Sequence, residues 1–311
     1  MGVNEDTLRR HYKKNWSGFH QWQQLMHAEK YLLYPQNITA HMAIDEVSLS
    51  QGELYTILSS RDRPGRKGKI AAVIRGTKAE DLISVLSKLP ESLRESVKEV
   101  TLDMSMSMVK AAQWAFPMAA LVTDRFHVER LSADAIQQAR IDQRWKEIDR
   151  EAKAIIKSRK QGTKYKPIIL TNGDTPKQLL ARSRYILYKM PHQWTKSQIH
   201  RAFLLFQLYP SIEQAYSFHM NFKNIYKLED LQKAKTALVD WIKRVQDSSI
   251  QYFQSVAESL IAYWERIVAF FTNSTNANAE SLNAQIKPFR SNLRGVTDTK
   301  FFLYRLEKIF A

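Results

Sequence analysis

The sequence predicts an α/β protein whose mixed β-sheet is interrupted by a large all-helical region. Two observations carry this prediction. Between residues 41 and 130, three strand-like segments are followed by an alternation of helix-like and strand-like segments. From 131 to 268, almost every segment shows helical spacing of its apolar residues. The 311 residues are 44% hydrophobic, which is enough for a sizeable core.

The strand-like segments predict three antiparallel strands followed by two parallel ones. The first three follow one another as a meander, whereas each of the last two comes after a helix. The expected strands are 41–50, 53–60, 70–76, 97–104 and 118–124, and the expected helices are 77–89, 106–116 and one beginning at 126.

We expect four regions along the chain. Residues 1–40 look helical and basic, and we interpret them as the remnant of a DNA-binding module or a linker to one. The first part of the sheet-containing core is 41–130, the all-helical insertion is 131–268, and 269–311 forms C-terminal helices of the core.

The composition favours a nucleic-acid partner. Lys and Arg number 47 against 31 acids, a net charge of +16, although a basic protein without such a partner is the alternative. The absence of cysteine excludes disulfides, thiol catalysis and cysteine-based zinc fingers. Any metal must therefore bind oxygen or imidazole, which suits Mg²⁺ or Mn²⁺. No membrane-spanning run or signal peptide is found, so we expect a cytoplasmic protein and no membrane partner.

Two aspartates in the expected strands are candidate metal ligands. Asp45 lies within HMAIDEVSLS, where a carboxylate is costly unless it is paired or holds a metal. Asp103 closes another strand, and if the two strands are neighbours their carboxylates repel unless a divalent cation holds them. Each also has a simpler explanation. Asp45 could be a satisfied polar group, and Asp103 could cap the following helix.

A third acid, Glu280, lies in the segment TNANAESLNAQIKPFRSNLRG. Glu280, Asn283 and Lys287 follow a helical spacing that places them on one helix face. An acid, an amide and a base make a poor core face but suit a metal with a phosphate backbone beside it. Taken alone, Glu280 is also an ordinary acid in the first turn of a helix.

Several motifs together resemble DDE-type insertion-sequence transposases, closest to the bacterial ISL-three group. They are AIDEVSL, GTKAEDL, VTLDMSMSMVKAAQWAFPMAALVTDRFHV, SRYILYK, LFQLYPSIEQAY and NANAESLNAQIKPFRSNLRG, and they span residue 41 to near the C-terminus. The order of strands and helices resembles the ribonuclease-H-like fold. The resemblance implies this fold for the sheet, interrupted by the helical insertion before the third catalytic acid.

The resemblance also implies a catalytic triad of Asp45, Asp103 and Glu280. These acids would hold two Mg²⁺ or Mn²⁺ ions and serve cleavage of DNA at transposon ends and strand transfer into target DNA. The implied partner is double-stranded DNA, bound by a homo-oligomer at the bacterial nucleoid. Members of the group often carry an N-terminal zinc finger and helix-turn-helix. We expect that module to be reduced here or supplied by a separate chain.

Further residues are expected around the triad. Asp124 and His127, in DRFH, resemble an acid-x-x-His signature of transposases with this insertion, which implies a role beside the triad together with Asn283. The alternative for Asp124 and His127 is a helix N-cap and a half-buried histidine. The basic loop RDRPGRKGK, including Arg61, could contact DNA or simply be solvated. The DNA-contact candidates are Lys287, Arg290, Arg294, Arg66, Lys67 and Lys69.

Three rival functions remain open from the sequence. One is a non-catalytic DNA-binding protein derived from a transposase, and another is a structure-specific nuclease of the same fold. The third, a helical scaffold for protein partners, rests only on residues 131–268.

Overall fold

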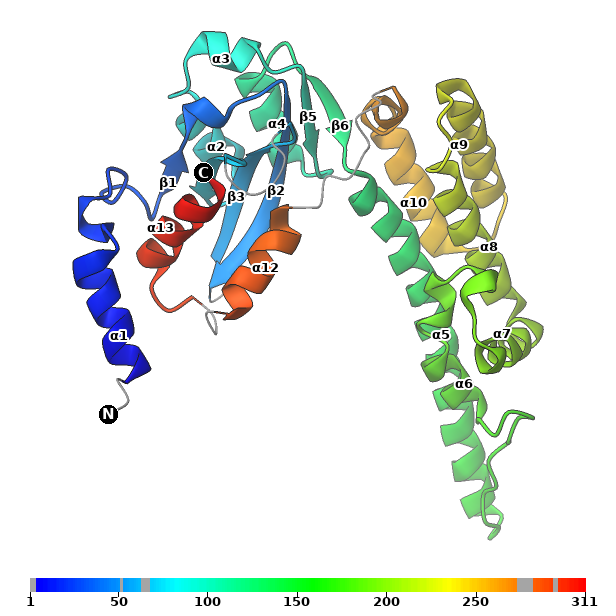
Figure 1. The fold of residues 1–311 in the computed structure, drawn as a ribbon. Helices are drawn as coiled ribbons and strands as arrows, with labels where there is room; N and C mark the ends of the chain where they lie inside the picture. Colours follow the sequence, from blue (N-terminus) through cyan, green and yellow to red (C-terminus); the bar gives the residue numbers. More distant parts are fainter. Residues whose placement is uncertain (1–3, 51–52, 63–67, 273–281, 293–295) are drawn as a thin grey trace. The chain divides into compact units, whose positions relative to one another are not determined.

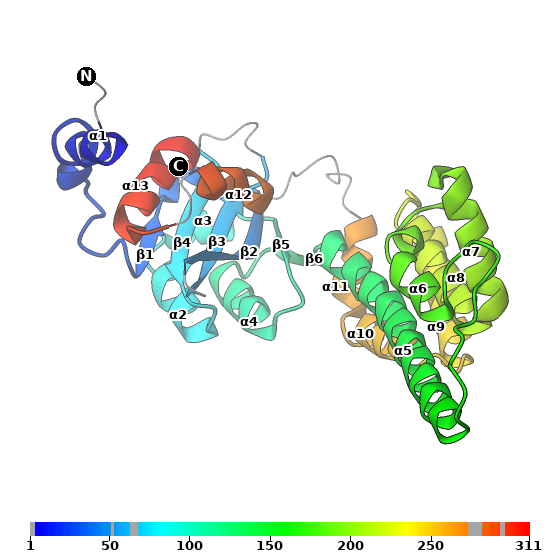
Figure 2. The same ribbon diagram turned by 90° about the horizontal axis from the view of Figure 1, so that it is seen from below.

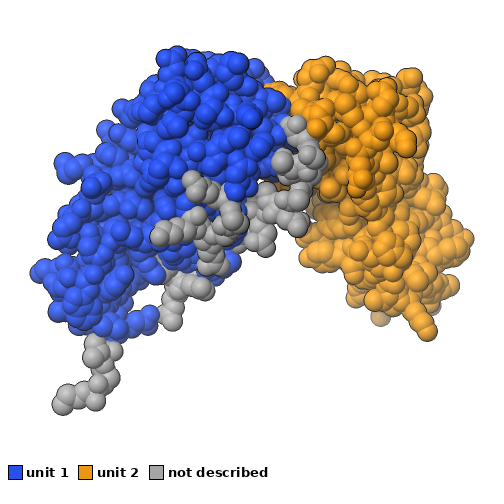
Figure 3. Space-filling view, turned by 45° about the horizontal axis from the view of Figure 1, so that its top comes forward, with its two compact units in different colours: residues 1–124, 273–311 blue, residues 125–272 orange. Residues whose placement is uncertain are grey.

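The computed structural model describes residues 4–50, 53–62, 68–272, 282–292 and 296–311 (Figure 1). The chain forms two compact units, which are coloured separately in Figure 3. The sheet unit comprises Met1–Asp124 and Asn273–Ala311, and the helical unit comprises Arg125–Thr272. The chain therefore leaves the sheet unit after residue 124 and returns to it at residue 273.

A six-stranded mixed sheet forms the centre of the sheet unit. Its strand order is β1-β4-β3-β2-β5-β6. The strands are β1 (Tyr31–Leu33), β2 (His41–Ser50), β3 (Glu53–Ser60), β4 (Ile70–Arg75), β5 (Glu99–Leu102) and β6 (Ala120–Thr123). Strands β2, β3 and β4 pair antiparallel, whereas β5 pairs parallel with both β2 and β6. The predicted mixed sheet, with three antiparallel strands followed by two parallel ones, is confirmed.

Strand β1 was not predicted, and the expectation that residues 1–40 are helical is wrong at this point. Leu32 is fully buried and pairs with Val73 of β4, so this short strand forms one edge of the sheet. Its three residues, YLL, are too few to show the alternation of apolar and polar positions by which strands are recognised.

Helices cover both faces of the sheet (Figure 2). On one face lie α2 (Ala79–Leu86), α3 (Glu91–Glu95) and α4 (Met106–Ala115), and on the other lie α12 (Leu282–Asn292) and α13 (Thr299–Phe310). Met42 and Ile44 of β2 belong to the core beneath α2 and α4, whereas Val47 packs with the core beneath α12 and α13. Because side chains alternate along a strand, Asp45 projects toward the α12 and α13 face.

Aromatic residues near the N-terminus complete the second face. Phe19 and Trp22 are buried against Tyr304 of α13, with ring centroids 5.6 and 5.4 Å away. The indole of Trp22 and the hydroxyl of Tyr34 both donate to the carboxylate of Glu307, at 2.5 and 2.7 Å. The segment between α1 (Glu5–His11) and β1 is thus packed against the sheet by its own aromatic side chains.

The helical unit is a bundle around the long helix α5 (Arg125–Lys160). The other helices of this unit are α6 (Pro176–Arg182), α7 (Lys196–Leu208), α8 (Pro210–Ile225), α9 (Leu231–Gln246), α10 (Gln251–Ala262) and α11 (Trp264–Val268). Phe222, Trp241 and Phe253 are fully buried at its centre, and the Trp241 indole donates to the Phe218 carbonyl at 3.0 Å. The helical prediction for this region is confirmed. No helix in the described ranges is long and apolar enough to cross a membrane.

Candidate active site

Three aspartates lie in a row across three neighbouring parallel strands. Ile44 of β2 pairs with Leu102 of β5, and Leu102 pairs with Thr123 of β6. The next residue on each strand is Asp45, Asp103 and Asp124, respectively. Because adjacent strands lie about 4.8 Å apart, the backbones of successive aspartates are separated by about that distance. All three side chains are half-buried.

The sheet topology explains why these acids meet. Strands β5 and β6 both end just before their aspartate and lead into helices, so their carboxyl ends share one edge. Strand β2 continues past Asp45, because it also pairs with β3, where Asp45 stands opposite Ile57. The acids therefore lie where the sheet changes from antiparallel to parallel pairing. Carboxyl ends of parallel strands at such switch points are the usual ligand-binding position in open α/β sheets.

Backbone amides orient two of the carboxylates. Asp45 Oδ1 accepts a hydrogen bond from the Glu46 amide at 2.8 Å, and Asp103 Oδ1 accepts one from the Met104 amide at 2.5 Å. Helix α4 begins after Ser105, so Asp103 is not its N-cap, which removes the simpler explanation for that residue. The Asp124 amide donates to the Leu102 carbonyl at 2.9 Å, which extends the β5–β6 pairing to this position.

Helix α12 carries the segment that was expected to supply the third acid. It lies along β2 in Figure 1, and near its end the Arg290 guanidinium donates to the Ser48 carbonyl. Helix α12 also contacts β2 directly, so the segment that begins with Leu282 packs over the strand that carries Asp45. Leu282 and Ile286 anchor this helix in the core.

The remaining predicted residues divide between those that the structure describes and those that it does not. Lys287 is exposed on α12, and Asn283 lies in the first turn of this helix. The Lys69 amide donates to the carbonyl of Phe310 at 2.6 Å, which ties the start of β4 to α13. Outside the described residues lie Glu280, Arg294, Arg66 and Lys67.

His127 lies in the first turn of α5 and is half-buried, with its ring edge-on to Phe126 at 5.8 Å. It belongs to the helical unit, whereas the three aspartates belong to the sheet unit. The structure thus brings Asp45, Asp103 and Asp124 together within one unit, and His127 lies three residues beyond the last of them.

Arg61 has a different place from the one its sequence suggests. It was expected in a basic loop that either contacts DNA or is solvated, but its guanidinium is mostly buried, pairs with Glu99 and donates to Thr101 Oγ1 at 2.6 Å. Thr101 precedes Asp103 by two residues on β5, so Arg61 helps to fix the strand that carries this acid. No signal in the sequence identifies this ion pair, because its partners are 38 residues apart.

The donor set suits a hard divalent cation. Asp45 and Asp103 supply carboxylate oxygens on adjacent strands, which are the ligands that Mg²⁺ and Mn²⁺ prefer. Within the described ranges, no group of three or more His, Cys, Asp or Glu side chains is arranged to hold a metal ion. The two aspartates therefore fit a metal site that a further ligand would complete.

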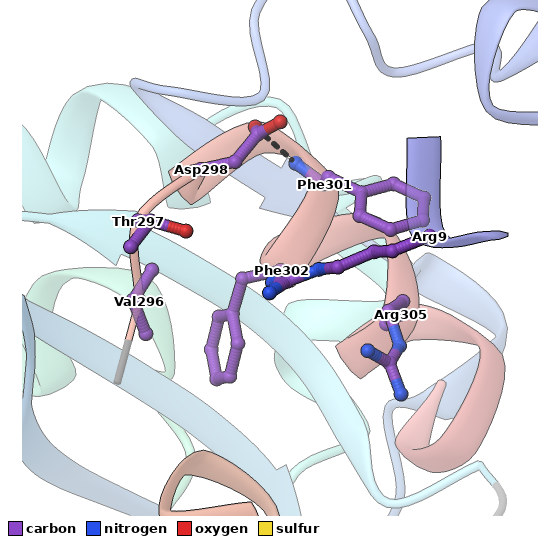
Figure 4. Close-up of a pocket in the computed structure, with 7 residues that line it drawn as sticks. All are labelled: Arg9, Val296, Thr297, Asp298, Phe301, Phe302 and Arg305. Carbon is purple, nitrogen blue, oxygen red and sulfur yellow. Dashed lines mark hydrogen bonds between the residues drawn. The ribbon is translucent and has the colours of Figure 1, made fainter. Parts of the chain in front are cut away.

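A small pocket of the sheet unit lies between α1 and the start of α13 (Figure 4). Asp298 borders it, but this carboxylate accepts a hydrogen bond from the Phe301 amide at 3.0 Å and pairs with Lys13. Its lining contains none of the predicted site residues, and consists of Arg9, Val296, Thr297, Asp298, Phe301, Phe302 and Arg305.

Comparison with known proteins identifies the class of this chain. Residues 42–306 match the ISL-three family of DDE transposases, whose description is "Transposase". The match covers more than half of the chain, so the chain belongs to this family.

One curated relative is the transposase for insertion sequence element IS1001 of Bordetella parapertussis. The two proteins are 23% identical over 273 residues, which is 87% of this chain and 61% of the relative. The chain thus spans about three-fifths of the length of the curated relative that it matches.

Proposed function

We propose that this chain is the catalytic part of a transposase that cleaves DNA at transposon ends and transfers the ends into target DNA. The observation that carries the proposal is the register that places Asp45 and Asp103 side by side on β2 and β5. Family membership supports the same reaction class. The six-stranded mixed sheet is consistent with a ribonuclease-H-like core, into which we propose that residues 131–268 are inserted.

In this proposal Asp45, Asp103 and Glu280 hold two Mg²⁺ or Mn²⁺ ions. Such a pair of ions activates an attacking oxygen and stabilises the leaving oxygen of a phosphodiester. The backbone amides of Glu46 and Met104 hold the two aspartates in place before the metals bind. Glu280 precedes α12 by two residues, and α12 contacts β2, the strand that carries Asp45. Asp124, His127 and Asn283 orient the site from its edge.

The cations near the site hold the DNA. Lys287 and Arg290 lie on α12, on the face of the sheet that carries Asp45, and we propose that Arg294 continues this contact. Lys69, Arg66 and Lys67 form a second contact at the start of β4. Both sets bind phosphates and contribute affinity rather than sequence specificity. Two DNA ends must be paired, so the active form is a homo-oligomer at the nucleoid. A candidate chain for recognition of the ends is added to the assay as a separate arm.

A cleavage and strand-transfer assay with Mg²⁺ or Mn²⁺ tests the proposal, with the DNA that flanks the gene as substrate. Asp45→Asn, Asp103→Asn and Glu280→Gln each slow both steps on the order of a thousandfold, because several kcal/mol of charge stabilisation are lost. Asp81→Asn, at an exposed acid of α2 in the same unit, is the matched control and keeps full activity.

Other outcomes favour the rival functions. Cutting without joining identifies a nuclease. Binding without either reaction, also when the recognition chain is added, identifies a non-catalytic DNA-binding protein. Full activity in any of the three variants removes that acid from the triad.

A further inference from the structure

The far end of α5 is built differently from the rest of the helical unit. The buried residues of this helix all lie at or before Glu147, so the thirteen residues from 148 to 160 have no buried position. These residues extend for about 20 Å. In Figures 1 and 2 this end of α5 projects beyond the other helices of its unit.

The helix ends in a defined turn. Gly162 adopts a left-handed conformation, with φ of 67°, and the Thr163 amide donates to the Ser158 carbonyl at 2.9 Å. This is the Schellman arrangement, in which a glycine closes the last turn of a helix and satisfies its carbonyls. The chain then returns beside α5 as an extended segment until α6 begins. The projection is therefore a folded arm with a capped end.

Positive charge is concentrated at the end of this arm. Residues 152–173 contain six basic side chains and no acid. All six are exposed, and none forms an ion pair with another described residue. They are Lys153, Lys157, Arg159, Lys160, Lys164 and Lys166, and we call residues 153–166 the basic tip.

The acids that border the arm neutralise little of this charge. Glu151 pairs with Lys177, and Asp174 is buried between Arg182 and Arg201, so both are already matched by other cations. The exposed Asp149 lies one helical turn before Lys153, about three turns from the end of α5. The five cations from Lys157 onward therefore face solvent. By contrast, residues 227–247, around α9, carry five cations and four acids, as is usual for a solvated surface.

Helix stability explains only part of the pattern. Lys157, Arg159 and Lys160 lie in the last turn, where cations interact favourably with the helix dipole. Lys153 lies a full turn earlier, and Lys164 and Lys166 lie beyond the helix, where the dipole has no such effect. Six like charges in a short folded arm repel one another, which lowers stability unless a polyanion binds there.

We propose that the basic tip is a DNA-binding surface of the helical unit, separate from the cations near the aspartates. It binds the phosphate backbone without reading sequence, as exposed Lys and Arg do. A tip-to-tip contact with a second copy of this chain does not fit the same surface, because two tips of like charge repel each other. The inference that the polyanion is DNA rests on the proposed function. The binding of DNA to the tip is nevertheless measured without catalysis.

The first test compares two variants of the full chain with equal charge loss. The tip variant carries Lys157→Gln, Arg159→Gln, Lys160→Gln and Lys164→Gln, with glutamine chosen because it retains the helix. The control carries Lys227→Gln, Lys233→Gln, Lys243→Gln and Arg244→Gln, around α9. Affinity for a short duplex of random sequence is measured by fluorescence anisotropy in EDTA, over a series of salt concentrations.

The tip variant binds at least about tenfold more weakly at low salt, and its salt slope falls by about 0.9 for each phosphate that the tip no longer neutralises. The control stays close to the wild type. Equal decreases in affinity for the two variants overturn the proposal, because they would reflect net charge alone. A wild-type chain that does not bind the duplex overturns it too, as does a tip variant that is impaired only in binding to anionic lipid vesicles.

A second test reports position instead of affinity. Because the chain has no cysteine, Thr163→Cys at the tip and Thr236→Cys on α9 each create a unique site for a DNA-cleaving iron chelate. The tip probe cuts bound duplex, and the α9 probe does not. Cutting from α9 alone would overturn the proposal. If the triad variants did not affect catalysis, the anisotropy and DNA-cutting results for the basic tip would still hold. The proposed function and the proposed tip surface can therefore fail independently.

Discussion

The two units place their acidic side chains in different settings. In the helical unit, buried acids lie beside cations. Asp174 is fully buried and contacts both Arg182 and Arg201, and Glu151 is mostly buried and contacts Lys177. Each acid of this kind is held by an opposite charge, so its position contributes to the packing of α5, α6 and α7.

In the sheet unit, Asp45, Asp103 and Asp124 follow one another at the same level of three adjacent parallel strands. Elsewhere in this unit an acid serves packing, because Glu99 of β5 is mostly buried and pairs with Arg61. A structural role is the natural explanation for Asp174, Glu151 and Glu99. Three acids gathered at the carboxyl ends of neighbouring parallel strands are instead expected where an α/β sheet binds a ligand.

Replacing one acid in each unit by asparagine tests this difference between the units most directly. Asp174→Asn lowers the free energy of unfolding of the helical unit by about 2–4 kcal/mol, because it removes a buried charge that accepts hydrogen bonds from two partly exposed arginines. Asp45→Asn changes the stability of the sheet unit by less than about 1 kcal/mol, because asparagine keeps the side-chain oxygen that accepts the hydrogen bond from the Glu46 amide.

Hydrogen exchange measured separately for amides of α6–α8 and of β2–β5 gives the two values. Asp81→Asn, at an exposed acid, sets the baseline for a substitution without structural consequence. A decrease in stability at Asp45 as large as that at Asp174 would mean that Asp45 is a structural residue, and would remove the basis for the site.

The sequence predicts the centre of the sheet better than its edges. Strands β2 to β6 follow from their apolar patterns. The meeting of Asp45 with Asp103 was left open by the residues and was implied only by the family resemblance. The edge strand β1 was not predicted, because three residues are too few to show the alternation of apolar and polar positions. Its place depends on packing with α13, more than 260 residues away in the chain.

Side-chain partners were the least predictable part of the site. Arg61 reads as one more cation of a basic loop, but its partner Glu99 lies on a strand that the sequence does not connect to it. The same holds for Asp174, whose partner Arg201 lies 27 residues further along. The basic tip could not be predicted for another reason. A run of cations is equally compatible with a solvated surface and with a ligand site until the fold shows that nearby acids such as Glu151 and Asp174 are paired with other cations.

The titration of a buried histidine in the helical unit is expected to have an effect of intermediate size on stability. His219 of α8 is buried, and its Nδ1 lies 2.8 Å from Ser132 Oγ. Burial lowers the pKa of His219 to about 4, with a smaller contribution from Lys223. Above pH 6.5 both folded and unfolded states are neutral. Below it the unfolded state takes up a proton first, so stability falls as the pH drops toward 4.

The expected decrease in stability between pH 6.5 and pH 4 is about 3 kcal/mol, from a shift of about 2.5 pKa units. Urea unfolding followed over this range measures the decrease, and His219→Gln isolates it from the titration of carboxylates. The variant loses less stability than the wild type by about that amount. If both chains lose stability in parallel, the histidine is not held neutral in the folded state.

Substitutions at two glycines, one in each unit, have the smallest expected effects on stability. They test the backbone conformation of the two units. Gly162 at the end of α5 and Gly18 in the sheet unit both adopt left-handed conformations, with φ of 67° and 75°. A Cβ at Gly162 would meet no atom within 4 Å, whereas one at Gly18 would lie 3.3 Å from the hydroxyl of Tyr304. Gly162→Ala therefore carries backbone strain alone, and Gly18→Ala carries strain and crowding.

Gly162→Ala costs about 1 kcal/mol, measured as faster amide exchange in the last turns of α5. Gly162→Asn costs less, because asparagine tolerates this conformation. Gly18→Ala costs more than Gly162→Ala, since the Tyr304 hydroxyl, which donates to the Ser17 carbonyl, must also move. If Gly162→Ala instead left the exchange of α5 unchanged, the arm would end in a frayed helix rather than a capped one. The basic tip would then have no fixed position from which to hold DNA.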